Sequence, residues 1–293
     1  KFENFVGENI NPSKTAKLYG INSSGMLDFI KPIFESDVLI SGGGSLLQDI
    51  TSLKSLIYYL TVIMCAIVFR KKIFIFAQGF SKFRTKLGEF ITKQVLKMCD
   101  NISVRDEQSK LYLKSLGIEA ELVSDPAFAI SIPNVNHQGV GVQIRNFHTL
   151  TDEFLTSLAK EISITFKGQE IKLFSLQDSI DIPALERFAK LLTSNNCIVK
   201  IYKNLNVAEC VHEISNLEYF IGMRFHACLI SAKAGVKTLG INYDKKVQTL
   251  SENVKFPIIN MFGCEVKEGI QQLLKTEPQN YNIPEFVFPN IIL

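Results

Sequence analysis

The stretch Asp37–Gly44, DVLISGGG, is a short apolar run that ends in three consecutive glycines. A short apolar run before a glycine cluster is typical of a strand that is buried on both faces. Residues 52–70 follow as a longer stretch that predicts a helix. A buried strand, a glycine turn and a helix in this order predict one unit of a parallel α/β sheet.

The same order of strand and helix recurs along the chain. One helix is predicted over residues 85–99, and another begins at Asp106 and stops at Gly117. The further predicted strands are Lys72–Ala77, Asn101–Arg105, Glu121–Ser124, Val140–Arg145, Ile171–Ser175, Cys197–Tyr202, Tyr219–Met223, Lys237–Asn242 and Pro257–Met261. Apolar strands that alternate with helices predict an α/β fold with parallel sheets.

The polar stretch Ser131–Gly139, SIPNVNHQG, interrupts this alternation and predicts a domain boundary. We assign residues 1–133 to an N-terminal Rossmann-like domain and residues 138–293 to a C-terminal one. Two parallel-sheet domains in tandem are expected to face a cleft, because ligands of such folds bind at the carboxyl ends of the strands.

The composition is that of a globular protein, since 46% of the residues are hydrophobic and 21% are charged. A net charge of +3 over 293 residues argues against nucleic acid as the main partner. The cysteines show neither CxxC pairs nor the spacing of metal ligands, which favours free thiols in a reducing, cytoplasmic compartment and no metal site. They are Cys65, Cys99, Cys197, Cys210, Cys228 and Cys264.

The segment Leu56–Phe69 is strongly apolar and is followed by Arg70, Lys71 and Lys72. It is shorter than the ~20 residues that a membrane-spanning helix needs. We expect a helix buried in the α/β core. The alternative is a helix on a membrane surface, which would place the protein at the cytoplasmic face of the inner membrane.

Two clusters of residues at predicted strand ends suit the binding of an anion. Gly42, Gly43, Gly44 and Ser45 can bring backbone N–H groups and a helix N-terminus to a ligand, or they can form a tight turn that Ser45 caps. Arg224 and His226 lie two residues apart after a strand. In extended geometry they would point the same way and could bind a phosphate or carboxylate and transfer a proton.

Further cations follow other strands. Lys245 and Lys246 come after the strand Lys237–Asn242, and a solvated charge pair is their alternative role. Arg105 can reach a ligand from a strand end or can pair with a neighbouring carboxylate, and Arg145 has the same two roles open to it. Gln78 comes at the end of a predicted strand, directly before Gly79, and we predict that it binds substrate.

With these elements placed, the sequence resembles the polysaccharide pyruvyl transferase family, in particular the bacterial enzymes that pyruvylate cell-wall polysaccharide for S-layer anchoring. The stretches that carry the resemblance occur in the family's order over residues 36–250. They are SDVLISGGGSLLQD with the YYL that follows, IFAQGF, ISVRDEQS, VSDPAF, GVQIR, FSLQDSID, IGMRFHA and GINYDKKV.

The resemblance implies a two-domain, GT-B-like fold and the transfer of a pyruvyl group from phosphoenolpyruvate to two hydroxyls of a sugar. Arg105 matches the Arg of the family's VRD motif, and Arg224 and His226 match its GMRxHA motif. Lys246 matches the Lys of YDPKV, while Lys245 stands where Pro is usual. In this scheme His226 is the general acid and base, the cations clamp the donor, and no cofactor or metal is needed.

The family also implies an acceptor such as a lipid-linked disaccharide with an N-acetylmannosamine-type sugar, although a capsule or exopolysaccharide unit fits equally well. Family members open with a strand and a glycine-containing loop that ends in Asp. This chain starts at Lys1, and we expect that it begins inside a longer reading frame. The alternatives are a glycosyltransferase that uses a nucleotide sugar and an inactive relative that binds saccharides.

Overall fold

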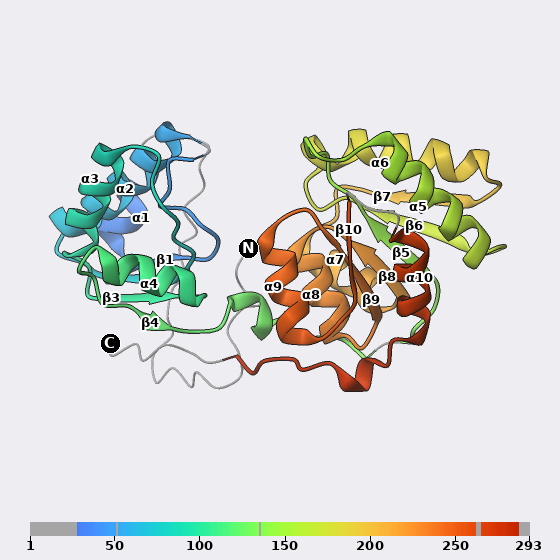
Figure 1. Ribbon diagram of the computed structural model, residues 1–293. Helices are drawn as coiled ribbons and strands as arrows, with labels where there is room; N and C mark the ends of the chain where they lie inside the picture. Colours follow the sequence, from blue (N-terminus) through green and yellow to red (C-terminus); the bar gives the residue numbers. More distant parts are fainter. Residues whose placement is uncertain (1–27, 51, 135, 262–264, 287–293) are drawn as a thin grey trace. The chain divides into compact units, whose positions relative to one another are not determined.

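The computed structural model describes residues 28–50, 52–134, 136–261 and 265–286 (Figure 1). The prediction that the family's opening strand is missing bears on the start of the chain, and residues 1–27 lie outside this described part. Cys264 and residues 287–293 lie outside it as well. The other five cysteines are free thiols.

The chain divides into two compact units, each with a parallel sheet and its own core. The first unit runs to Ala129 and includes Glu285 and Phe286, and the second spans Ile130–Pro284. We placed everything after residue 138 in the second domain, but Glu285 packs with the first unit. Its backbone oxygen accepts a hydrogen bond from the Ser124 hydroxyl at 2.9 Å.

The first unit contains a four-stranded sheet in the order β1-β2-β3-β4. Its elements are α1 (Ile30–Glu35), β1 (Val38–Gly42), α2 (Leu53–Val68), β2 (Lys72–Gln78), α3 (Lys86–Leu96), β3 (Asn101–Val104), α4 (Glu107–Ser115), β4 (Glu121–Leu122) and a 3₁₀ turn at Pro126–Ala129. Consecutive strands are neighbours and the crossovers between parallel strands are right-handed, so α2, α3 and α4 cover the same face of the sheet.

The second unit contains a six-stranded sheet in the order β10-β9-β8-β5-β6-β7. Its elements are β5 (Val140–Gln143), α5 (Asp152–Thr165), β6 (Glu170–Phe174), α6 (Asp178–Ser194), β7 (Ile198–Tyr202), α7 (Val207–Ser215), β8 (Tyr219–Gly222), α8 (Phe225–Lys233), β9 (Lys237–Asn242), α9 (Lys245–Val254), β10 (Ile258–Asn260), α10 (Val266–Lys275) and a 3₁₀ turn at Pro278–Asn280. This is the Rossmann strand order, and its direction reverses between β5 and β8. Every predicted strand is present, and the α/β fold with parallel sheets is confirmed.

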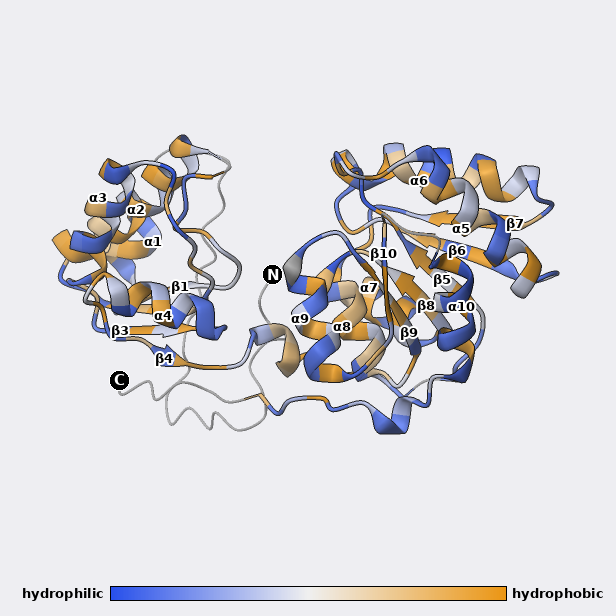
Figure 2. Cartoon of the chain, in the orientation of Figure 1, coloured by the Kyte–Doolittle hydropathy of each residue, from blue (hydrophilic) through white to orange (hydrophobic). Residues whose placement is uncertain are grey.

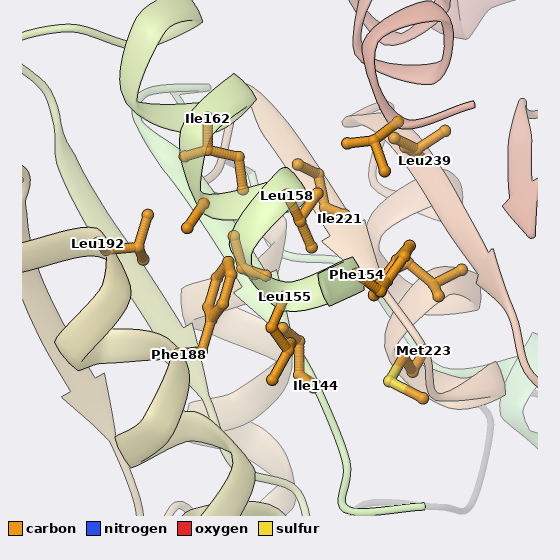
Figure 3. Packing of buried hydrophobic residues seen from close by; sticks show 14 of the residues in the cluster. Ile144, Phe154, Leu155, Leu158, Ile162, Phe188, Leu192, Ile221, Met223 and Leu239 are labelled. Carbon is orange, nitrogen blue, oxygen red and sulfur yellow. The ribbon is translucent and has the colours of Figure 1, made fainter. Parts of the chain in front are cut away.

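The core of each unit is built from apolar residues at the spacing that the sequence predicts. In the second unit Leu155 and Leu158 of α5 and Phe188 of α6 belong to one buried cluster with Ile221 of β8, as Figure 3 shows. Hydrophobic residues occupy most of β5 and β8, the central strands of the second unit, which are buried on both faces (Figure 2).

Helix α2 contains most of the strongly apolar segment. It begins at Leu53, where the Ser52 side chain accepts a hydrogen bond from the Ser55 N–H. Leu56 and Ile63 face the core, whereas Ile57 on the opposite side is 55% exposed. The expectation of a buried helix therefore holds for one face of α2 only. None of the helices in the described part of the chain has the length and apolar character that crossing a bilayer requires.

The two faces of α2 allow a matched test of the fold. Replacing Ile63 by Ala should destabilise the first unit by about 2–5 kcal/mol, because the side chain is fully buried and its removal leaves a cavity. Ile57→Ala should change stability by less than about 0.5 kcal/mol. Thermal melting followed by circular dichroism measures both. Equal losses for the two variants would contradict the assignment of the inner face.

Candidate functional site

In the first unit, the loops that follow β1 and β2 are joined to each other. Gly43 and Gly44 have φ values of +76° and +67°, a left-handed conformation that glycine adopts at little cost. The Gly43 N–H donates to the Phe76 oxygen at 3.0 Å, and the Gly44 oxygen accepts from the Gly79 N–H at 2.8 Å. The three glycines therefore form a turn that is held against the end of β2.

The helix that we expected to follow the glycine loop directly begins farther along the chain. The next helix does not follow Ser45 but begins at Leu53, and Ser52 rather than Ser45 caps it. The Gly43 N–H is already bonded to β2. The loop places the Ser45 side chain next to Arg105, and its binding of an anion stays a prediction.

Arg105, just after β3, lies close to Ser45. Its Nη1 donates to Oδ2 of Asp125 at 2.8 Å, and its Nη2 lies 3.4 Å from the Ser45 Oγ. The guanidinium and the Asp125 carboxylate are both largely buried. Of the two roles open to Arg105, pairing with a carboxylate is therefore present, although its partner is Asp125 and not a sequence neighbour.

Gly79 lets the loop after β2 pass directly over this guanidinium. A Cβ at this position would lie 2.7 Å from the Ser45 Oγ and 3.2 Å from two nitrogens of Arg105. Any side chain would therefore displace one of these groups. The close approach explains why a glycine follows Gln78 here.

Gln78 is turned into the same strand-end region by an irregularity in β2. Ala77 has a φ of +47°, and the register between β2 and β3 shifts at this point. The Gln78 Nε2 donates to the Ser41 oxygen and hydroxyl at 3.0 Å. Its Oε1 is buried without a hydrogen-bond partner among the described residues. Such an acceptor is costly unless a ligand or water bonds it.

Asp49, in the loop between β1 and α2, has a structural role. Its carboxylate accepts hydrogen bonds from the N–H groups of Arg84 and Thr85 at 2.6 and 2.8 Å and from the Thr85 hydroxyl. Burial by itself would raise the pKa of the Asp49 carboxyl, but these hydrogen bonds outweigh burial and hold the pKa below its ordinary value. The ionised carboxylate thus anchors the turn that leads into α3.

In the second unit, Gln143 bridges the point where the strand order reverses. It ends β5, and its Oε1 accepts from the N–H groups of Met223 at 3.3 Å and Arg224 at 2.8 Å, just beyond β8. Ligands of Rossmann-like sheets bind at this switch point, outside the carboxyl ends of the strands. Gln143 therefore shapes the part of the sheet where a ligand is expected.

Arg224 is held by a buried carboxylate at the same place. Its Nη2 and Nε donate to Asp181 at 2.6 and 2.9 Å, and Asp181 is 0% exposed. Oδ2 of Asp181 also accepts from the N–H groups of Leu176 and Gln177 at 3.0 Å. The charge of Arg224 is thus balanced within the protein, and its side chain fixes the turn between β8 and α8.

Arg224 and His226 do not lie in an extended segment, so the expectation that alternation aligns them is wrong. Arg224 is the N-cap residue of α8, and His226 belongs to the first turn of that helix. The helix begins immediately after Arg224 because Gln143 and Asp181 already hold this residue. The exposed imidazole of His226 lies edge-on to the Phe225 ring.

Arg145 is the arginine of this region whose charge is not balanced by a carboxylate within the described part of the chain. Its Nη1 donates to the Tyr243 hydroxyl at 3.2 Å, and its guanidinium lies 5.4 Å from the Tyr243 ring and 5.8 Å from the Phe147 ring. Its Nε is buried without a partner among the described residues. The guanidinium is therefore oriented by neutral groups.

Lys246 lies in the first turn of α9, where its N–H donates to the Asp244 side chain at 3.2 Å. Its own side chain is exposed. Lys245 begins α9, and its side chain lies outside the described part. The choice between these two lysines as the one that faces a donor therefore stays a prediction.

Asp125, Gln143, Asp181 and Tyr243 are site residues that the sequence patterns did not single out. Asp125 lies in VSDPAF and Asp181 in FSLQDSID, two of the stretches that carry the family resemblance. The signal that could have found these two carboxylates is electrostatic, since most buried charged groups are paired with a group of opposite charge. No group of three His, Cys, Asp or Glu side chains in the described part could hold a metal ion.

Residues 2–245 match the model of one protein family, described as polysaccharide pyruvyl transferase, and the chain belongs to this family. The match covers most of the sequence and confirms the resemblance that the ordered motifs indicated. A search of curated proteins finds no significant match.

Solved structures with a similar fold include UDP-N-acetylglucosamine 2-epimerases. A Listeria monocytogenes protein described as such an enzyme has a TM-score of 0.63 and 10% identity over 92% of this chain and 78% of its own. The Methanocaldococcus jannaschii enzyme has a TM-score of 0.61 and 13% identity over 92% and 80%. The Neisseria meningitidis enzyme, solved with UDP-GlcNAc bound, has a TM-score of 0.59 and 10% identity over 89% and 76%. At these identities the likeness concerns the fold alone, which is GT-B-like as predicted.

The ion pair between Asp181 and Arg224 should matter greatly for stability. Asp181→Ala should cost about 3–5 kcal/mol, because it leaves a largely buried guanidinium and two N–H groups without their acceptor. Asp152→Ala is the control, since Asp152 forms an exposed pair with Arg187 and should change stability little. Chemical denaturation measures the free energy of unfolding of both variants, and equal values would refute this account.

Asp49 should make stability depend on pH. Because its folded pKa is lowered, its contribution is fully present above the unfolded value near ~4 and is lost as the pH falls through the folded value. Asp49→Asn should therefore be about 1–3 kcal/mol less stable than the wild type at pH 7. The gap should narrow below pH ~4. Melting curves over pH 3–7 measure it, and a gap that is constant with pH would contradict the prediction.

Proposed function

We propose that this member of the polysaccharide pyruvyl transferase family transfers the pyruvyl group of phosphoenolpyruvate to two hydroxyls of a sugar, which forms a cyclic ketal. The observation that carries the proposal is Arg145. It is an oriented guanidinium at the switch point of the second sheet, and no carboxylate of the described part neutralises it. A donor with a carboxylate and a phosphate requires such a cation.

Three neighbouring strands of the second sheet supply the residues that this reaction needs. Arg145 follows β5, His226 follows β8, and Lys246 follows β9. The carboxyl ends of adjacent parallel strands lie at one edge of the sheet, so these side chains come from adjoining loops. His226 belongs to the first turn of α8, and the positive end of this helix's dipole favours an anion. The start of α9 is capped by Asp244, so Lys246 contributes there through its exposed side chain.

The proposed reaction proceeds by an addition to C2 of the donor and then a substitution at the same carbon. Protonation of the methylene carbon by His226 gives C2 cationic character, one sugar hydroxyl attacks it, and His226 takes up the proton of that hydroxyl. A second hydroxyl then displaces phosphate, which leaves with the proton of this hydroxyl, so that two C–O bonds form and the bond from C2 to the phosphate oxygen breaks. Arg145 and Lys246 offset the charge of the carboxylate and the departing phosphate.

Arg224 and Arg105 have different roles in this proposal from those first expected. The charge of Arg224 is balanced by Asp181, so it positions the turn that carries His226. Arg105 is paired with Asp125 and lies beside Ser45, so it orders the loops of the first unit for a substrate. The Gln78 Oε1, which is buried without a partner in the described part, is offered to a hydroxyl donor such as a sugar.

We extend the proposal to the acceptor and the setting of the reaction. A sugar of a cell-wall or surface polysaccharide precursor, carried on a lipid in the cytoplasm, supplies the two hydroxyls. An N-acetylmannosamine-type residue for S-layer anchoring is one such acceptor. The scheme needs no cofactor, because the donor itself supplies the activated carbon.

The test is a comparison of Arg145→Gln with Arg187→Gln, whose arginine is exposed on α6. Phosphoenolpyruvate should raise the Tm of the wild type and of Arg187→Gln. The affinity for phosphoenolpyruvate should fall about 10–100-fold in Arg145→Gln, the loss expected for charge-assisted hydrogen bonds. His226→Ala should keep this binding but release phosphate about 10²–10⁴-fold more slowly in the presence of an acceptor.

The outcomes distinguish this proposal from its rivals. Stabilisation by UDP-GlcNAc and not by phosphoenolpyruvate would favour a nucleotide-sugar glycosyltransferase. Normal turnover in His226→Ala would remove this residue from the mechanism. Binding of saccharide without any phosphate release would indicate an inactive relative.

A further inference from the structure

Helix α2 is apolar on the side that faces away from the core as well as on the side that faces it. Leu53, Ile57, Met64 and Val68 form one stripe at helical spacing, and all four are exposed, Val68 to 71%. The fifth member of the stripe is Thr61, whose hydroxyl donates to the Ile57 oxygen at 2.8 Å. A helix that is hydrophobic all round is normally covered on all sides.

The neighbouring helices continue this exposed surface. Helices α1 and α3 both pack beside α2, and Phe34 of α1 and Phe90 of α3 are 65% and 60% exposed. Figure 2 shows hydrophobic segments on all three helices. We call this surface the helical face, and it consists of Phe34, Leu53, Ile57, Met64, Val68, Leu87, Phe90, Ile91 and Met98.

Exposed apolar side chains are concentrated in the first unit. Of the eighteen large hydrophobic side chains that are exposed in the described part, fourteen belong to this unit, although it is the smaller of the two. Scattered exposed hydrophobics are normal on a soluble protein, whereas a contiguous patch marks an interaction site. The second unit contains the other four exposed side chains and serves as an internal comparison.

Most of the charges around the helical face are positive. Residues 52–100 contain nine Lys and Arg and two acidic residues, Glu89 and Asp100. The Asp100 carboxylate accepts a hydrogen bond from the Ile73 N–H at 2.7 Å. Lys54, Lys86 and Lys97 are exposed on or beside α2 and α3. The Glu89 carboxylate accepts a hydrogen bond from the Tyr112 hydroxyl, and Glu35 of α1 pairs with Lys31 at 3.9 Å. The rim of the face is therefore basic.

We propose that the helical face docks on an anionic membrane surface. An anionic lipid surface offers both an apolar layer for Ile57 and Phe90 and negative charge for the basic rim. A second copy of this chain would bring two basic rims together, which like-charge repulsion disfavours. Helix α2 has 16 residues, fewer than the ~20 that a bilayer span requires, so it lies along the surface.

Docking of this kind would bring the enzyme to substrates that are carried on lipids. The inference rests on the described helices α1 to α3 and does not depend on the donor in the proposed function. For that function, docking means that the enzyme encounters a lipid-linked acceptor by diffusion along the membrane surface.

The test is co-sedimentation of the chain with vesicles of phosphatidylcholine that contain ~30% phosphatidylglycerol. The wild type should bind these vesicles and not pure phosphatidylcholine, and added salt should release it. The double variant Ile57→Ser/Met64→Ser should bind about tenfold or more weakly, because it removes apolar area from the docked face. Lys54→Gln/Lys97→Gln should weaken binding to a similar degree.

The matched controls are Ile164→Ser/Ile198→Ser and Lys160→Gln/Lys190→Gln, whose residues are exposed on the second unit. These variants should bind like the wild type. Circular dichroism and the Tm shift with phosphoenolpyruvate verify that each variant is folded, and they separate a failure of docking from a failure of the proposed function.

Two results would overturn the proposal. The first is a wild type that does not bind anionic vesicles, or variants of both units that lose binding equally. The second is a wild type that sediments as a dimer by ultracentrifugation while Ile57→Ser/Met64→Ser is a monomer, which would assign the face to self-association.

Discussion

The bonds that join Asp181, Arg224 and Gln143 determine the geometry of the candidate site in the second unit. A carboxylate that is 0% exposed is tolerated because Arg224 and two backbone N–H groups satisfy it. Gln143 adds bonds to the N–H groups of Met223 and Arg224, across the point where the strand order reverses. The start of α8, and with it the position of His226, follows from this network.

The same chemistry recurs in the first unit with different elements. Arg105 follows β3 and is paired with the buried Asp125, while Ser45 and Gly79 pack against its guanidinium. In both units an arginine at a strand end is balanced by a carboxylate from another segment. An arginine whose charge is balanced in this way orders loops. Arg145 differs because only neutral groups contact it among the described residues, and for this reason the proposed function assigns the binding of an anion to Arg145.

Helix α2 packs one face in the core and presents another apolar face to solvent. Its inner face supplies Leu56 and Ile63 to the core, as its apolar sequence predicted. Its outer face is equally apolar and is exposed, which core packing does not explain. The basic residues beside it are the reason for the proposal that this face docks on an anionic surface.

The order of strands and helices was determined by the sequence alone, because short apolar runs such as Val38–Ile40 and Ile73–Phe76 alternate with longer helical stretches, which is typical of a parallel sheet covered by helices. The ordered motifs also determined the family and the GT-B-like fold class. The roles of individual cations were not determined, since Arg105, Arg145 and Arg224 look alike in sequence. Only the tertiary structure decided which of them meets a buried carboxylate. Asp125 and Asp181 lie 20 and 43 residues from their arginines, and charge pairing over such separations depends on the folded path of the chain.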